Sequence, residues 1–187
     1  MKRFILILFL LLAAREIRAF GLAGHAAIAC IAEHHLTPRA RANIMRYTDH
    51  RSIVYYASWM DYMGYVTKSG YSNEWFDHCV PVNKDFEYAE GDFPGDALMA
   101  IEKAIERLGD GKYRNLDDST VLLLIKHLVH FLPDMHCPAH IRYPGNTTIG
   151  YYKVDYFGRE MRYHTIWDSE IVQRPHPWSF TDLAWLL

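Results

Sequence analysis

The stretch that decides the fold is DDSTVLLLIKHLVHFLPDMHCPAH, residues 117–140. Its first three residues are typical helix N-caps, and the apolar run behind them predicts a long helix over about 120–133. His130 and Asp134 are four residues apart, so both side chains are expected on one face of this helix. His140 follows a proline, where the chain can turn back towards the same place. The stretch therefore predicts a buried helix that ends in side chains able to ligate a metal.

Helical patterns dominate the rest of the sequence. Apolar periodicity, capping residues and breakers predict further helices over 24–36, 38–48, 52–63 and 95–108. Residues 149–164 alternate around Phe157-Gly158-Arg159 and predict a short β-hairpin. The expected fold class is all-α, a compact helical domain with a minor β excursion.

The N-terminus has the features of a secretory signal. Lys2 and Arg3 precede an unbroken apolar run over 4–14, which is too short to span a bilayer stably. A membrane anchor is the alternative. We expect cleavage after Ala19, which makes Phe20 the mature N-terminus of a secreted or periplasmic protein. The mature chain is then a single domain, 20–187, with no stable membrane association and a monomeric state.

The charge of the mature chain limits how it can bind anions. Loss of residues 1–19 leaves 16 basic and 21 acidic residues, a formal charge of −5. A protein that held nucleic acid through a basic surface would have the opposite balance. Affinity for anionic substrates would have to come from bound metal, which the formal count omits.

A second His/Asp pair strengthens the metal hypothesis. His164 and Asp168 repeat the spacing of four seen in His130 and Asp134. One such pair is more often an ion pair on a helix surface, but two pairs with a flanking histidine indicate a site. Imidazole nitrogen and carboxylate oxygen form a ligand set that suits zinc outside the cytosol.

Five motifs occur in an order that resembles the S1/P1 family of zinc-dependent single-strand nucleases and 3′-nucleotidases. They are FGLAGH (20–25), ASWMD (57–61), FDHCV (76–80), HFLPDMHCPAH (130–140), and PGN (144–146) with RYHTIWD (162–168). The resemblance covers about 20–172, nearly all of the mature chain. It implies the helical fold that these nucleases share with zinc-dependent phospholipases C.

The resemblance also implies a centre of three zinc ions. One ion would be held by Asp61, His78, His130 and Asp134. Asp134 would bridge to a second ion, bound also by His25 and by the α-amino nitrogen and carbonyl oxygen of Phe20. The third would be held by His140, His164 and Asp168. Because the α-amino group of Phe20 exists only after signal cleavage, the second ion depends on that cut.

The implied reaction is hydrolysis of P–O3′ bonds in single-stranded DNA, RNA and 3′-nucleotides, which leaves 5′-phosphates. Asp61 and Asp134 are the candidate catalytic residues, and His136 and Asn146 the candidate substrate-binding residues. Two other activities remain open: a phospholipase C-like hydrolase, and a non-catalytic binding protein whose zinc only holds the fold.

The sequence departs from the family pattern in three places. Gly64 stands where the family has a basic residue, and Lys68 and Arg142 are the candidate replacements. Pro133 replaces the glycine before the bridging aspartate and is expected to kink the helix. Relatives run further past the last motif, so the chain is expected to be truncated at its C-terminus.

The three cysteines leave at least one thiol unpaired. Cys30 lies in an apolar helical run and is expected in the core. A bridge between Cys79 and Cys137 is possible in an oxidising compartment.

Overall fold

A computed structural model describes residues 21–61, 76–89, 95–144, 152–175 and 178–186. The predicted signal peptide, Phe20, Gly64, Lys68 and Asn146 lie outside the described residues.

The central element is α6 (Asp118–Asp134), which confirms the helix predicted from the opening stretch. Asp117 caps it, because its carboxylate accepts from the Thr120 backbone N–H at 2.8 Å. Pro133 sits in the last turn and does not end the helix before Asp134. The chain leaves α6 through the short helix η3 (Pro138–His140).

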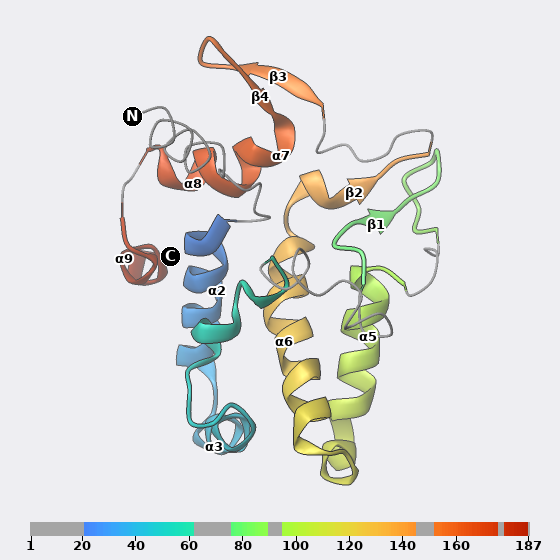
Figure 1. Cartoon of the computed structure of the whole chain (residues 1–187), viewed down its shortest axis with the longest axis vertical. Coiled ribbons are helices and arrows are strands. Elements are labelled where there is room, and N and C mark those ends of the chain that lie inside the picture. Colours follow the sequence, from blue (N-terminus) through green and yellow to red (C-terminus); the bar gives the residue numbers. More distant parts are fainter. Residues whose placement is uncertain (1–20, 62–75, 90–94, 145–151, 176–177, 187) are drawn as a thin grey trace, which may run out of the picture.

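Two helices, α5 (Ala97–Leu108) and α2 (Gly21–His35), flank α6 on opposite sides (Figure 1). The core lies in the two layers between α6 and these helices. α5 begins at the cap Asp96, and α2 begins near the end of α6. Between α5 and α6 the buried core residues are Met60, Phe76, Ala97, Ala100, Ile101 and Phe131. On the α2 side they are Ala29, Ile53, Ala57, Val121 and Ile125. Each group contains two alanines, whose small side chains let the backbones approach closely at these positions.

The helix predicted over 52–63 is only partly right. Ser52 caps a 3-10 helix, η1 (Ile53–Tyr56), and the chain turns before it is helical again from Trp59. The other early helix, α3 (Pro38–Tyr47), is as predicted, with Thr37 as its cap. A second 3-10 segment, η2 (Gly109–Asn115), connects α5 to α6.

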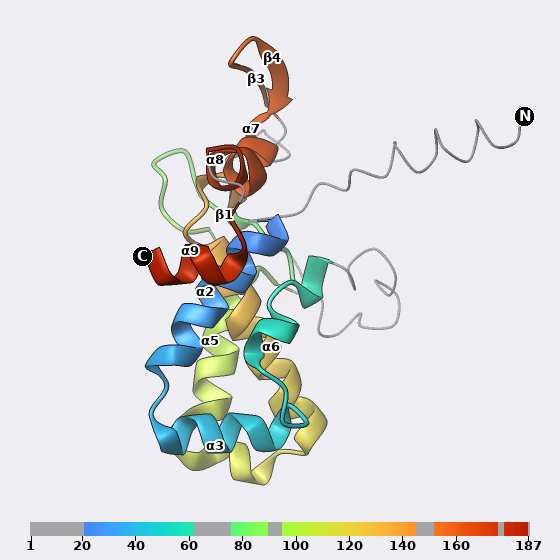
Figure 2. The same cartoon turned by 90° about the vertical axis from the view of Figure 1, so that its left-hand side faces the viewer.

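The strands are short. β3 (Lys153–Tyr156) and β4 (Arg159–Arg162) form the predicted hairpin, which projects from the helical body (Figure 2). β1 (Val80–Pro81) and β2 (Ile141–Arg142) form a parallel pair that the sequence did not predict. This pair joins the segment after His78 to the segment after His140.

The C-terminal part, residues 163–175 and 178–186, comprises α7 (Tyr163–Thr165), the π-helical turn η5 (Ile166–Glu170), α8 (Ile171–Gln173) and α9 (Phe180–Leu186). It packs against α2 through η5 and α9. The all-α fold class with a small hairpin is confirmed. Within the described residues, no helix has the length and apolar character needed to cross a membrane.

Candidate metal centre

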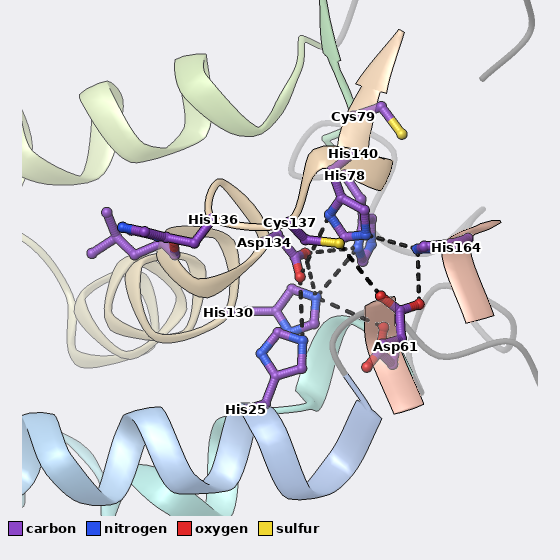
Figure 3. A network of polar contacts seen from close by, with 12 residues as sticks. His25, Asp61, His78, Cys79, His130, Asp134, His136, Cys137, His140 and His164 are labelled. Atoms are coloured by element: carbon purple, nitrogen blue, oxygen red, sulfur yellow. Dashed lines mark hydrogen bonds and ion pairs between the residues drawn. The ribbon is translucent and has the colours of Figure 1, made fainter. Parts of the chain in front are cut away.

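Histidines and aspartates from five separate segments converge in one cluster (Figure 3). The cluster lies where α2 begins and α6 ends, two places that are neighbours in the fold (Figure 1). The described members of the predicted metal site are His25, Asp61, His78, His130, Asp134, His140, His164 and Asp168. Six of these eight are buried, and His78 and His164 are partly exposed. The structure therefore brings together residues that are far apart in the sequence.

Asp134 lies at the middle of this cluster. Its Oδ1 is 3.3 Å from His25 Nε2 and 3.6 Å from His140 Nδ1. Its Oδ2 is 3.3 Å from both His78 Nδ1 and His130 Nε2. Each oxygen thus faces a different pair of imidazoles, which is the arrangement needed by a carboxylate that bridges two metals.

The backbone fixes the orientation of His130. Its Nδ1 lies 2.9 Å from the carbonyl oxygen of Ala57, which can only accept, so Nδ1 carries the proton. The lone pair is then on Nε2, which faces Asp134 and lies 3.8 Å from Asp61 Oδ1. A ligating imidazole held by a hydrogen bond through its other nitrogen is typical of metal sites.

A third group lies beside the first two. His140 Nε2 is 2.8 Å from His164 Nε2, which is 2.9 Å from Asp168 Oδ2. His164 belongs to α7 and Asp168 to the π-helical turn that follows it. The two residues, four apart in sequence, therefore face each other although the helix changes type between them. Short π-helical turns occur often at functional sites.

The geometry fits tetrahedral metal ions. Two nitrogen or oxygen ligands at 2.0–2.1 Å from one zinc lie about 3.3 Å apart, which is the separation repeated around Asp134. Asp61 Oδ2 is buried without a hydrogen-bond partner, and the oxygens of Asp134 and Asp168 Oδ2 are buried against imidazole nitrogens without forming a regular hydrogen bond. Buried polar atoms are rarely left so, and a cation would satisfy all of them. Three groups of side chains within the described residues could each hold a metal ion.

Burial and neighbouring charges shift the pKa values of these groups. Burial opposes ionisation of Asp134, but His140, His130 and other imidazoles outweigh it and keep its pKa well below the usual range. Burial lowers the pKa of His140 to about 4 and that of His130 well below 6.5. Asp61 behaves oppositely, because burial raises its pKa to about 6. At neutral pH His130 and His140 thus present neutral imidazole lone pairs and Asp134 an anionic carboxylate, the forms that bind metal. Burial opposes the charged form of His78, but its hydrogen bond with Asp134 and the charges of Asp134 and Asp61 raise its pKa.

Gly21 allows the start of α2 to reach this cluster. Its φ is +35°, and a Cβ at this position would lie 2.5 Å from the backbone oxygen of Asp168. Only glycine fits so close to another backbone. The contact brings the first residue of α2 against the segment that carries Asp168.

Other predicted residues lie elsewhere. His136 is exposed, with its Nδ1 2.8 Å from the Leu132 carbonyl oxygen, and its ring points away from the cluster (Figure 3). Arg142, a candidate replacement for the missing basic residue, forms an ion pair with Asp77. Phe20 and Asn146 are outside the described residues.

The cysteines are all buried and unbridged. Cys30 lies in the core, as predicted. The sulfur of Cys79 is turned away from the cluster, so the possible bridge to Cys137 is not formed (Figure 3). Cys137 instead directs its sulfur towards the cluster, 3.6 Å from Asp168 Oδ1. This orientation of the Cys137 sulfur was not predicted from the sequence, although Cys137 stands only three residues before His140.

These features define a helical protein whose buried histidines and aspartates could hold several metal ions. A sequence profile of the S1/P1 nuclease family matches residues 20–182, most of the chain. The chain belongs to the S1/P1 nuclease family and is a hydrolase of the nuclease class. No individual curated protein matches it significantly.

Proposed function

We propose that the protein is a secreted, zinc-dependent phosphodiesterase that hydrolyses P–O3′ bonds, which gives 5′-phosphate products from single-stranded DNA and RNA and inorganic phosphate from 3′-nucleotides. The observation that carries this proposal is the Asp134 carboxylate, whose two oxygens face separate histidines at 3.3 Å within a chain of the S1/P1 family. Secretion rests on the signal-like sequence of residues 1–19.

Each ion would be held by ligands from several elements. The first would be bound by Asp61, His78, His130 and Asp134, and the third by His140, His164 and Asp168. The second would be bound by His25 and Asp134, together with the mature N-terminus at Phe20. Bound zinc would supply Lewis acidity, a lowered pKa for its water and positive charge for a phosphate.

The chain's own groups then position the reaction. Asp134 keeps the His25 side and the His130 side of the centre at a fixed separation through its two oxygens. Asp61 Oδ2 is buried without a hydrogen-bond partner, so it can orient the attacking water. Asn146 is our candidate for contact with the nucleobase.

The charge of the centre explains how an acidic protein could bind phosphate. Three Zn²⁺ against three aspartates leave a local charge of about +3, while the mature chain carries −5 overall. Such a field attracts phosphate groups to one place instead of to the whole surface.

The substrate class can be tested directly. Zinc-loaded protein would be given single-stranded DNA, RNA, a 3′-nucleotide and phosphatidylcholine, each with and without a chelator. We expect 5′-phosphorylated nucleotides from DNA and RNA, and a nucleoside with inorganic phosphate from the 3′-nucleotide, and none of these products with the chelator. Turnover of the lipid alone would instead identify a phospholipase C-like enzyme. Zinc binding without any turnover would identify a binding protein.

A further inference from the structure

Cys137 occupies the third group of the metal centre. It is 2% exposed, and its Sγ lies 3.6 Å from Asp168 Oδ1. Cys137, His140 and Asp168 each place a ligand atom within 4.8 Å of the other two. The sulfur points into the histidine cluster (Figure 3).

The distances suit coordination by sulfur. Zinc binds thiolate at about 2.3 Å and carboxylate oxygen at about 2.0 Å, so two such ligands on one tetrahedral ion lie about 3.5 Å apart. The separation of Cys137 Sγ from Asp168 Oδ1 is close to this value. Asp168 Oδ2 lies 2.9 Å from His164 Nε2, which lies 2.8 Å from His140 Nε2, so the other members of this group also bring their ligand atoms close together.

We propose that Cys137 is a fourth protein ligand of the third metal ion, beside His140, His164 and Asp168. This inference rests on the zinc centre proposed above. When the metal binds, the S–H bond breaks, a sulfur–metal bond forms and the proton leaves to solvent.

Four protein ligands would change the role of this ion. Structural zinc sites are closed by four protein ligands, whereas catalytic sites keep one position open. The third ion would therefore hold the C-terminal segment in place, and the chemistry would belong to the two ions that share Asp134. A thiolate would also favour zinc or cadmium over magnesium or manganese.

The competing explanation is a hydrogen bond from the Cys137 thiol to Asp168. Serine is at least as good a donor as cysteine, so Cys137→Ser would preserve such a bond. It would remove a sulfur ligand. The same substitution therefore separates the two roles.

The test is cobalt substitution of the mature chain. Wild type, Cys137→Ser and the control Cys79→Ser would be stripped with a chelator, reloaded with Co²⁺ and compared by near-ultraviolet absorption and metal content. Cys79 is a suitable control because it is a buried thiol near the centre that faces away from it. We expect a thiolate-to-cobalt charge-transfer band in wild type and Cys79→Ser. Cys137→Ser should lack the band and bind its last cobalt about tenfold or more weakly.

Two results would overturn the proposal: fully loaded wild type without the band, or a band that persists in Cys137→Ser. If Cys137→Ser does not fold, zinc-edge X-ray absorption of zinc-loaded Cys79→Ser tests the same assignment. We expect a shell of sulfur at about 2.3 Å from zinc in this variant, which still contains Cys137. Its absence would contradict the assignment. Nuclease assays on the same zinc-loaded samples keep the two proposals apart. A sulfur signal without hydrolysis would refute the function alone, and hydrolysis without a sulfur signal would refute the ligand alone.

Discussion

Asp61 and Asp134 are two buried carboxylates of one cluster with opposite pKa shifts. Imidazoles surround Asp134 and favour its charged form, whereas burial dominates at Asp61 and disfavours charge. Metal binding therefore requires the ionised form of Asp61, whereas folding without metal favours its neutral form. A carboxylate that is costly to bury without metal becomes favourable once a cation is beside it.

This conflict predicts a pH-dependent effect of Asp61→Asn in metal-free protein. The pKa of Asp61 is raised from 3.8 to about 6. Its contribution to stability is thus fully present below about pH 4 and is lost as the pH rises through about 6. At pH 7.5 the neutral asparagine avoids a cost of up to about 3 kcal/mol.

The measurement is urea unfolding of both chelator-treated proteins at pH 4 and pH 7.5. Because His140 titrates in both proteins, the difference between them isolates Asp61. We expect the variant to gain stability relative to wild type at the higher pH, yet to lose zinc affinity. An equal difference at both pH values would show that Asp61 is not strained by burial.

At the scale of elements, the centre depends on contacts between segments that are remote in sequence. The start of α2 touches the π-helical turn at Gly21, and β1 pairs with β2 beside His78 and His140. These contacts set the distances between ligands that no single helix carries. Their loss should affect metal binding as well as stability.

Gly21→Ala tests the first of these contacts. The added Cβ would meet the Asp168 backbone oxygen at 2.5 Å in a positive-φ conformation, so one segment must move. We expect a loss of about 1–3 kcal/mol in unfolding free energy and weaker zinc binding. Gly109→Ala is the matched control, because nothing lies within 4 Å of its Cβ position. Equal stability and zinc content in both variants would refute the proposed role of the contact.

The difference between local contacts and contacts of remote segments explains how much of the fold and of the site could be predicted from the sequence. The helix bounds near Thr37, Asp96 and Asp117 follow from local capping, which depends on adjacent residues alone. The pairing of His130 with Asp134 follows from helical spacing. The proposed upstream ligands His25, Asp61 and His78 have no such local signal, and only the family resemblance indicated them.

Other features required the folded chain. The direction of the Cys137 sulfur depends on how the chain turns after α6 and on where η5 lies. The break after Tyr56 and the β1–β2 pair depend on packing against remote segments. Periodicity contains no information on contacts of this kind.

For the molecule as a whole, we expect the cluster of buried histidines and aspartates to make the stability of the fold dependent on metal. Asp134 and Asp168 both disfavour the charged form of Asp61 in the absence of a cation. Ions that bind only the folded state stabilise it in proportion to the logarithm of their concentration. The protein is thus expected to be considerably less stable without zinc.

Chelation tests this dependence. Removal of zinc should lower the midpoint of thermal unfolding, and zinc added back should raise it again. At a hundredfold excess over Kd, each site is expected to add about 2.7 kcal/mol to the free energy of unfolding. Magnesium should not replace zinc, because magnesium prefers oxygen ligands to imidazole nitrogen. A midpoint that stays unchanged after verified loss of zinc would exclude a metal contribution to folding.

The central claim is that Asp134 bridges two of three zinc ions. Its most direct test is the zinc content of the secreted chain after N-terminal sequencing, for wild type, Asp134→Asn and the control Asp118→Asn. Asp118 is an exposed aspartate in the first turn of the same helix. We expect a terminal Phe20 and about three zinc ions in wild type and Asp118→Asn, but about one in Asp134→Asn. A wild-type chain with a single zinc, or Asp134→Asn with an undiminished zinc content, would contradict it.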